Sequence, residues 1–435
     1  MFRRRKTNRT LCLCFLGAGL SLFCEDTASA LTLDQAYAMA LKQAESVGRS
    51  EAVLQEAEQE YRRRIGIVYP SLALKATEQI QDVPDTPTSG GNTSVQGTFV
   101  RRSRPEVAVE GKYTLFSGLR EYSGLAASKA TVRQRSFEYD RAKQGLYAEL
   151  ATAFYLTISR AKEIELLEAS IKILNDRIRE LSNFERLGKS RPSERVSVEA
   201  DRERAQADTK QLEGELNALK YLMGFYLGVE TLPPLEEGSV DPVTAPTLQE
   251  CVDDVTKRPD IEALRASVER YKKEVRFYKG GYAPTLDFIG RYYPYRVGFV
   301  EDIDWDLEFV LNFPFFEGGQ TRAEVKGALA RVRQSELTLQ ETERKAKYEV
   351  QSKHALLLAA LERYSALLKS TELNEKNYKL QSKEYRLGLV TNLDVLKVLE
   401  QFYQTRRDLE NTRLRTKQLL AELNAARGKI PAETP

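Results

Sequence analysis

The sequence predicts a mixed fold, in which long α-helical coiled coils build a tunnel and membrane β-strands build part of a barrel. Three observations predict it. The chain contains two tandem copies of one unit, each unit has a long helix-forming stretch without proline, and each has two segments in which apolar and polar residues alternate. Apolar spacings of three to four residues indicate helices, whereas a spacing of two indicates strands.

The first 30 residues are predicted to be a secretory signal peptide. A basic head precedes an apolar stretch from Leu11 to Phe23, and Ala28-Ser29-Ala30 forms a cleavage site. The apolar stretch is too short to span a bilayer, which takes about 20 helical residues. We therefore expect residues 1–30 to be removed and the mature chain to be exported. The alternative is a lipidated Cys24, which the bulky Phe23 before it disfavours.

Composition excludes several classes of protein. The chain has 66 basic and 63 acidic residues, and the basic excess lies in the predicted signal peptide, so the mature chain has no basic footprint for nucleic acid. A mean hydropathy of −0.46 and the lack of a long apolar run exclude helical membrane spans. Membrane strands remain permitted, because their residues alternate. Only Cys251 lies beyond the signal peptide, which excludes an intramolecular disulfide.

The internal repeat covers most of the chain. Leu115-Phe116-Ser117-Gly118 matches Phe315-Phe316-Glu317-Gly318, and Arg186-Leu187-Gly188 matches Arg386-Leu387-Gly388, both at an offset of 200 residues. One offset held over this distance indicates a duplicated unit. We assign residues 31–228 to repeat 1, 229–247 to a linker, 248–428 to repeat 2 and 429–435 to a C-terminal tail.

Each repeat is predicted to contain an initial helix, a strand pair, a long helix and a return helix. The long helices are expected at 119–187 and 319–387, and each would be a rod of about 100 Å at 1.5 Å per residue. The other elements are expected at 33–69, 71–116 and 189–227 in repeat 1, and at 248–283, 285–316 and 389–427 in repeat 2. Because an initial helix and a return helix together nearly match a long helix, we expect them to stack end to end beside it.

A heptad seam of apolar residues runs from Ile164 to Leu181 in the long helix of repeat 1, which is a coiled-coil signature. The equivalent positions of repeat 2 include Thr371, Asn374 and Tyr378. We therefore predict a helix in repeat 2 but not the same apolar seam.

The predicted strands indicate a membrane surface. In the last of the four, one face is wholly apolar, and we predict that it contacts lipid; its residues are Trp305, Leu307, Phe309, Leu311 and Phe313. The alternative is a soluble four-stranded sheet packed on a helix. Open sheet edges are forbidden in lipid, so several chains must complete a barrel. Two chains would give eight strands around a filled lumen, and three would give twelve strands with room inside.

Several segments of the chain, in their order and twofold repetition, resemble the TolC-like outer membrane efflux proteins. The resemblance rests on residues 31–36 (LTLDQA), on Tyr69-Pro70-Ser71-Leu72, on residues 115–118 (LFSG) and 315–319 (FFEGG), and on the two Leu-Gly tips. It covers residues 31 to 428. It implies a homotrimer with a twelve-stranded outer-membrane barrel, four strands per protomer, and a periplasmic helical tunnel closed by the helical tips.

The resemblance also implies partners and a role. A periplasmic adaptor protein and an inner-membrane transporter would engage the chain, which would be the passive outer-membrane channel of a tripartite efflux or type I secretion system. The adaptor would dock on the tips, at Leu187, Gly188, Leu387 and Gly388. The two glycines also have a purely structural use, since glycine tolerates the left-handed backbone at a helix C-terminus.

In this family two acids after the second Leu-Gly commonly ring the constricted entrance. Here Asp394 keeps the first acid, Lys397 replaces the second, and Glu194 corresponds to Asp394 in repeat 1. The resemblance thus implies an aperture lined by Asp394 and Glu194, with Lys397 able to cancel the charge of Asp394. The alternative is an ordinary acid at a helix start, favoured by the helix dipole.

No pattern indicates an enzyme, a cofactor or a metal site. The only histidine, His354, aligns with Phe154 and is expected to be structural or solvated, and no glycine-rich phosphate loop is present. The competing class is a periplasmic coiled-coil adaptor or scaffold, which would share the helical hairpins but lack the alternating strands. The exported substrate is not specified by these residues.

Overall fold

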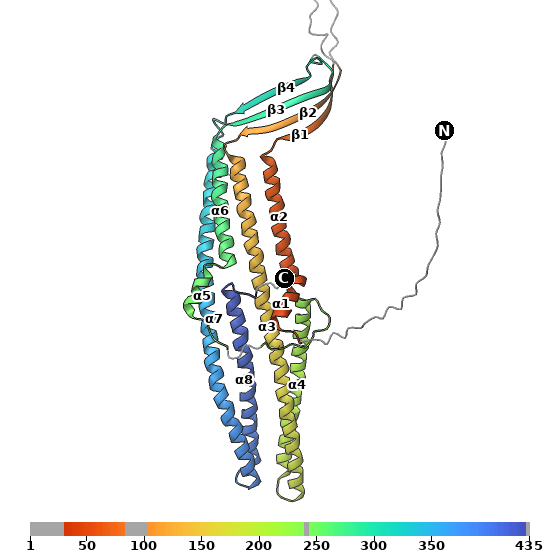
Figure 1. The fold of residues 1–435 in the computed structure, drawn as a ribbon. Helices are drawn as coiled ribbons and strands as arrows, with labels where there is room; N and C mark the ends of the chain where they lie inside the picture. The colour runs from red at the N-terminus through yellow and green to blue at the C-terminus, as the bar shows by residue number, and fades with distance from the viewer. Residues whose placement is uncertain (1–29, 83–101, 239–242, 299, 432–435) are drawn as a thin grey trace, which may run out of the picture.

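The computed structural model describes residues 30–82, 102–238, 243–298 and 300–431. The predicted signal peptide, with Cys24, lies outside the described residues. A wall of long helices carries a four-stranded antiparallel sheet at one end (Figure 1). The predicted combination of long helices with four strands is confirmed.

Two long helices run from the sheet to the opposite end of the molecule, α3 (Arg120–Arg186) and α7 (Gln320–Arg386). The chain then returns along each of them, in α4 (Pro192–Leu227) and α8 (Asn392–Ala426). Contacts place α8 between α3 and α7, and α4 on the other side of α3. The wall therefore has two different edges, one formed by α4 and the other by α7.

The initial helix of each repeat is broken, which corrects our prediction of continuous helices at 33–69 and 248–283. In repeat 1, α1 (Leu33–Gln43) and α2 (Glu45–Ile67) are separated by Ala44, whose backbone is extended. In repeat 2, α5 (Leu248–Val255) is separated from α6 (Pro259–Lys279), which a short 3-10 turn, η2 (Gly280–Tyr282), follows. Proline has no N–H and disfavours helical backbone in the residue before it, so Pro259 starts a new helix.

The broken helices still lie in line with the return helices. Figure 1 shows α2 following the line of α4 beside α3, and α6 following the line of α8. The breaks lie near the middle of the wall, where α1 turns its buried residues onto α3 instead of continuing the line of α2.

The sheet joins the two repeats. Its strands are β1 (Ser71–Ile80), β2 (Ser103–Phe116), β3 (Thr285–Arg296) and β4 (Trp305–Asn312), in spatial order β1-β2-β3-β4 with antiparallel neighbours. Each repeat contributes one hairpin, and the β2–β3 pairing connects them. Among the described strands, β1 and β4 each have one edge without a partner.

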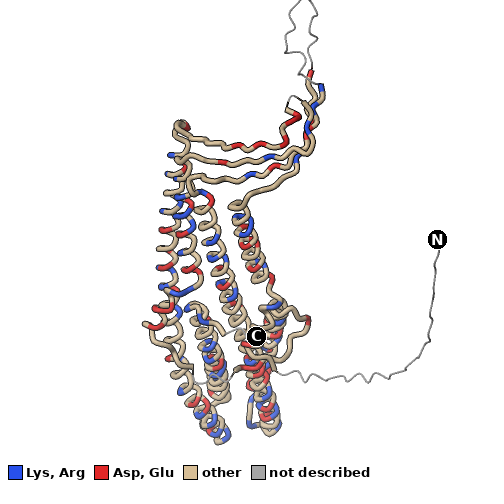
Figure 2. The backbone as a smooth tube through the Cα atoms, turned by 45° about the horizontal axis from the view of Figure 1, so that its top comes forward, with Lys and Arg blue, Asp and Glu red and all other residues tan. Residues whose placement is uncertain are grey.

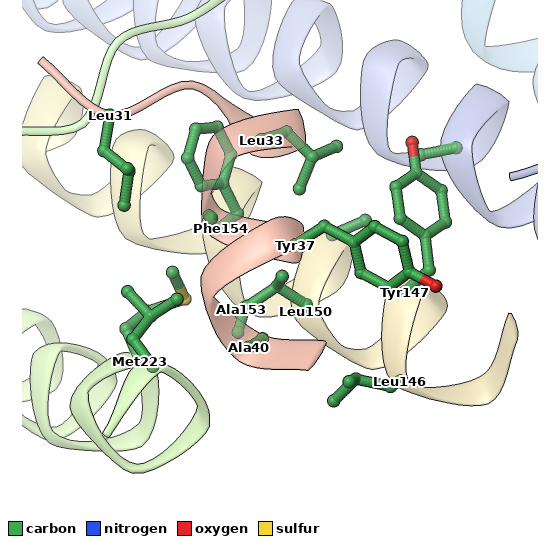
Figure 3. Close-up of a cluster of buried hydrophobic side chains, with 14 of the residues drawn as sticks. Leu31, Leu33, Tyr37, Ala40, Leu146, Tyr147, Leu150, Ala153, Phe154 and Met223 are labelled. Atoms are coloured by element: carbon green, nitrogen blue, oxygen red, sulfur yellow. The ribbon is translucent and has the colours of Figure 1, made fainter. Parts of the chain in front are cut away.

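The main core lies where α1, α3 and α4 meet (Figure 3). Phe154 and Leu150 of α3 are fully buried there with Met223 of α4. Tyr37 of α1 meets Tyr147 edge to face, with 5.1 Å between the ring centroids. The N-terminal segment is thereby fixed across the long helix.

The linker between the repeats is fixed as well. The backbone N–H of Leu31 donates to the carbonyl of Pro234 over 2.7 Å, and Nε2 of His354 lies 2.9 Å from the carbonyl of Pro246. His354 is buried in α7 and serves a structural role. Cys251 is a fully buried free thiol.

Gly118 is required at the junction of β2 and α3. Its φ is +67°, and an added Cβ would overlap the carbonyl oxygen of Gly280 and lie 2.8 Å from Cβ of Ala283. Gly318, its counterpart in repeat 2, also has a positive φ but has open space around it. We expect Gly118→Ala to destabilise the fold by about 2–5 kcal/mol and Gly318→Ala by only about 1–2 kcal/mol. Denaturant unfolding measures the loss of stability in both variants. Equal losses would show that the cost comes from the left-handed backbone alone and not from the overlap at Gly118.

Candidate functional site at the helical tips

The tips are the two turns farthest from the sheet, α3 to α4 and α7 to α8. Gly188 and Gly388 adopt left-handed backbone there, with φ of 66° and 72°. The N–H of Lys189 donates to the carbonyl of Phe184 over 2.8 Å, which satisfies a free carbonyl at the helix end. Leu187 and Leu387 are exposed beside the glycines. Each tip therefore carries an exposed leucine beside a glycine with left-handed backbone.

Asp394 is part of a helix cap. Its carboxylate accepts hydrogen bonds from the Thr391 backbone N–H over 2.9 Å and from the Thr391 hydroxyl over 2.6 Å, while its own N–H donates to that hydroxyl oxygen. This is a capping box at the start of α8. The bonds from Thr391, with a smaller contribution from Lys397, hold the pKa of Asp394 below its usual range. The side chain is charged and remains accessible.

Glu194 and Lys397 are placed differently from Asp394. The Glu194 carboxylate accepts from the Ser190 hydroxyl over 2.9 Å and from the Tyr385 hydroxyl of the other hairpin over 3.3 Å. In the described part of the chain, Lys397 forms no ion pair with Asp394. It lines a groove between the hairpins instead. The cancellation of the Asp394 charge by a Lys397 ion pair is therefore not seen.

A buried arginine joins the two hairpins, and our sequence analysis missed it. Arg177 of α3 donates from Nε and Nη2 to Oδ1 of Asn392 on α8, over 2.9 and 2.8 Å, and pairs with Glu180 over 2.7 Å. Its guanidinium lies 3.8 Å from the ring centroid of Tyr385 on α7. Nothing in the heptad pattern distinguishes Arg177 from exposed arginines nearby, because Asn392 and Tyr385, which it contacts, come from the other repeat.

A groove of about 500 Å³ lies between α4 and α8, and residues of α3 also line it. Its apolar lining includes Leu167, Leu174 and Leu396. Asp201 and Glu400 also line it, and burial together with the nearby Glu400 carboxylate raises the pKa of Asp201. The groove beside the tip is therefore amphipathic.

The sheet has two chemically different faces. Trp305, Leu307, Phe309 and Leu311 of β4 are exposed on one face, and Phe313 is exposed just beyond the strand. On the other face, Arg291 of β3 connects the strands on both sides of it. It donates to Glu110 of β2 over 3.1 Å, and to Asp306 and Glu308 of β4 over 3.2 and 2.9 Å. Figure 2 shows the charged positions along the strands and the helical wall.

Among the described residues, no helix is both long and apolar enough to cross a membrane. No group of three or more histidine, cysteine, aspartate or glutamate side chains there is arranged to hold a metal ion.

Residues 255–429, most of repeat 2, match the model of the family described as outer membrane efflux protein. A search of curated protein sequences finds no match.

Solved structures share the fold over nearly the whole chain. The outer membrane protein VceC of Vibrio cholerae has a TM-score of 0.79 at 18% identity, with 91% of this chain and 96% of that chain covered. The MtrE outer membrane channel of Neisseria gonorrhoeae has a TM-score of 0.77 at 19% identity, covering 91% and 89%. A membrane protein of Pseudomonas aeruginosa has a TM-score of 0.82 at 17% identity, covering 93% and 91%. The described chain has the fold of these proteins.

Proposed function

We propose that the chain is the outer-membrane channel of a tripartite efflux or type I secretion system, and that it works as a homotrimer. It provides a passive exit across the periplasm and the outer membrane. The sheet lies in outer-membrane lipid, and the helical wall extends into the periplasm.

The observation that carries this proposal is the apolar face that continues across all four strands. Leu74 of β1 pairs with Val109 of β2, which pairs with Tyr292 of β3, which in turn pairs with Trp305 of β4. All four side chains are exposed. A continuous exposed apolar surface of this kind is unfavourable in water and indicates a binding or membrane surface. A charged opposite face suits a water-filled lumen.

Sheet topology supports assembly of several chains. The free edges belong to β1 and β4, which run in opposite directions, so β4 of one protomer pairs antiparallel with β1 of the next. Lipid tolerates only closed barrels, and three four-stranded sheets give twelve strands around a lumen with room inside. In the same way, the two different edges of the helical wall, α4 and α7, meet between protomers and close the wall into a ring.

The tips are the proposed docking site for a periplasmic adaptor that links the channel to an inner-membrane transporter. Leu187 and Leu387 supply exposed apolar contacts, and Gly188 and Gly388 fix their turns. Solved structures of the same fold include an outer membrane channel, which supports the channel role but not the choice of adaptor.

The proposed aperture carboxylates, Asp394 and Glu194, are testable without disturbing their hydrogen bonds. Asp394→Asn and Glu194→Gln keep an acceptor oxygen for Thr391 and Tyr385 but remove the charge. We expect the double variant to need about tenfold more Mg²⁺ for half-block of conductance, equivalent to about 1.4 kcal/mol. Because the pKa of Asp394 is lowered, block of the unaltered channel should persist as pH falls through the usual aspartate range. Glu372→Gln, which removes an exposed acid higher on α7, is the control, and unchanged block would place the constriction elsewhere.

The proposed function is tested by gel mobility and by conductance. The purified full chain in detergent should migrate as a trimer that heating converts to a monomer, and it should conduct ions in a planar bilayer. A monomer that extracts from the envelope without detergent would contradict the channel and favour a periplasmic adaptor or scaffold.

A further inference from the structure

We propose that a groove between α3 and α6, where these helices meet the sheet, binds an anionic phospholipid of the membrane leaflet that faces the periplasm. Cations of the groove hold the phosphate, and apolar side chains of the groove contact the acyl chains. The inference rests on the proposed function, because it takes the apolar face of the sheet to lie in lipid.

The groove has a volume of about 570 Å³ and lies where the first turns of α3 meet the last turns of α6 (Figure 1). Its floor is formed by backbone. An added Cβ on Gly280 would lie 2.6 Å from the carbonyl oxygen of Gly118, so neither glycine can be replaced by a residue that fills the space. The close approach of the two helix ends therefore leaves a hollow.

The groove continues the apolar face of the sheet. Phe116, which lines the groove, pairs with Leu286 of β3, and Leu286 pairs with Leu311 of β4. Residues that pair directly across strands lie on the same face of a sheet, and Leu311 belongs to the face that we assign to lipid. The groove thus lies at the helical end of that face, which is its periplasmic boundary in the proposed orientation.

Three large apolar side chains of the groove are exposed, Phe116 at 42%, Leu119 at 59% and Tyr122 at 60%. In the described part of the chain, Leu119 is also the only residue other than glycine with a positive φ, of 62°. The corresponding residue of repeat 2 is Gly319, so the turn does not require a leucine. An exposed leucine on left-handed backbone is unfavourable in water, and contact with a hydrocarbon chain offsets that cost.

The other side of the groove is formed by three cations of α6, which are Lys273, Arg276 and Lys279. Because they are three residues apart, their like charges are neighbours on the helix surface, which is unfavourable without a counter-charge. The helix dipole favours cations in the last turn, where Arg276 and Lys279 lie, but Lys273 lies before that turn. Three positive charges therefore border one hollow.

No negative charge of the described chain balances these cations. No acidic residue is among those that line the groove. The adjacent charges of α6 are already paired, Lys272 with Glu336 over 3.1 Å and Glu274 with Arg270 over 2.7 Å. The pocket on the charged-face side of the same junction is lined by acids as well as cations. The unbalanced positive charge is therefore a property of this groove.

These features favour an anionic phospholipid over other occupants. Phosphate oxygens accept hydrogen bonds from lysine, and the arginine fork suits a phosphate. A zwitterionic lipid also carries an ammonium group, for which the groove offers no acid. A free phosphate would leave the apolar side chains in water, whereas acyl chains cover them. Basic clusters at the edge of membrane segments are typical sites for anionic headgroups.

A tryptophan reporter tests the groove in the full chain, reconstituted in phosphatidylcholine vesicles that contain phosphatidylglycerol. The single tryptophan, Trp305, is changed to phenylalanine, and Tyr122→Trp places the reporter in the groove. Lipid brominated on its acyl chains quenches a tryptophan that it contacts. We expect phosphatidylglycerol to occupy the groove about tenfold more than phosphatidylcholine at equal concentrations. Equal quenching by the two brominated lipids would overturn the proposal.

Charge removal assigns the preference to the three cations. Lys273→Gln, Arg276→Gln and Lys279→Gln together should abolish it. Lys272→Gln, which removes a lysine charge at the adjacent position outside the groove, should leave it unchanged. Trp305 of the unaltered chain is a second control, because it lies at the end of β4 away from the helices and should show no preference. A preference that survives the triple change, or that inorganic phosphate displaces, would overturn the lipid site.

Leu119→Gly tests the apolar side of the groove. In detergent without lipid, this variant should be no less stable than the unaltered chain, because glycine adopts left-handed backbone without strain. Added phosphatidylglycerol should raise the temperature at which the trimer dissociates, since a ligand of the folded state stabilises it, and should raise it less in the variant. Equal protection would overturn the placement of the acyl chains. A conducting trimer without lipid preference removes only this inference, whereas a monomer that extracts without detergent removes the proposed function as well.

Discussion

Replacing Phe309 by arginine should destabilise the folded chain in a lipid bilayer by about 2–4 kcal/mol, because a charge near the middle of the bilayer loses its hydration. Phe309 lies on the exposed apolar face of β4, with its ring 5.1 Å from that of Phe288 on β3. In a soluble protein, the same change at an exposed position would have little effect.

The neighbouring residue provides the control for this prediction. Val310 points to the charged face, where β4 also carries Asp306 and Glu308. Val310→Arg should therefore retain near-normal stability. Urea unfolding in vesicles, followed by the shift of heat-modifiable gel mobility, measures both variants. Equal stability of the two variants would contradict the assignment of Phe309 to lipid.

Loss of Arg177 should open the tip. Arg177→Ala removes two hydrogen bonds to Asn392, the ion pair with Glu180 and the stacking on Tyr385. It also leaves the buried Asn392 oxygen without its main donor. Hydrogen bonds to charged groups contribute about 1.5–3 kcal/mol, and stacking on an aromatic ring adds about 0.5–2 kcal/mol. Because 1.4 kcal/mol changes an equilibrium tenfold, the open fraction should rise at least about tenfold.

Arg179 supplies the matched control for Arg177. It lies two residues away on α3, and its ion pair with Asp176 is exposed to solvent, where such pairs contribute about 0–1 kcal/mol. Arg179→Ala should leave the single-channel open probability unchanged. Equal open probabilities in Arg177→Ala and the unaltered chain would show that the two hairpins are held together elsewhere.

The strand faces followed directly from the residue pattern. Strict alternation around Phe309 is a local property, since successive side chains of a strand point to opposite sides. The apolar and the charged residues of β4 therefore lie on opposite faces, as the alternation predicts. Contact of the apolar face with lipid stays a prediction. The long helices were equally local, because proline-free stretches rich in helix-forming residues leave few alternatives.

The breaks at Ala44 and Pro259 show the limit of that reasoning. Pro259 carries a recognisable signal, since proline starts helices and restricts the residue before it, and it should have ended the predicted helix. Ala44 carries none, because alanine is the best helix former. The chain breaks there because α1 packs Tyr37 against Tyr147 of α3, a contact between segments far apart in the sequence.

The tip residues divide in the same way. The capping box of Thr391 and Asp394 is a spacing of three residues, so the alternative of an ordinary helix-start acid was visible in advance. Glu194 and Arg177 depend on Tyr385 and Asn392, which belong to the other repeat. No spacing within one repeat specifies which side chain crosses to the other hairpin.

By itself, the sequence determined the duplicated unit, the long helices, the four alternating strands and the glycines at the turns. Each depends on residues within a few positions of one another, where backbone geometry and side-chain period act. Only the tertiary structure decided that Arg177 closes the gap between hairpins, that Lys397 faces a groove, and that α4 and α7 form opposite edges of the wall. These features depend on which distant side chains meet when the helices pack, and packing is a property of the whole chain.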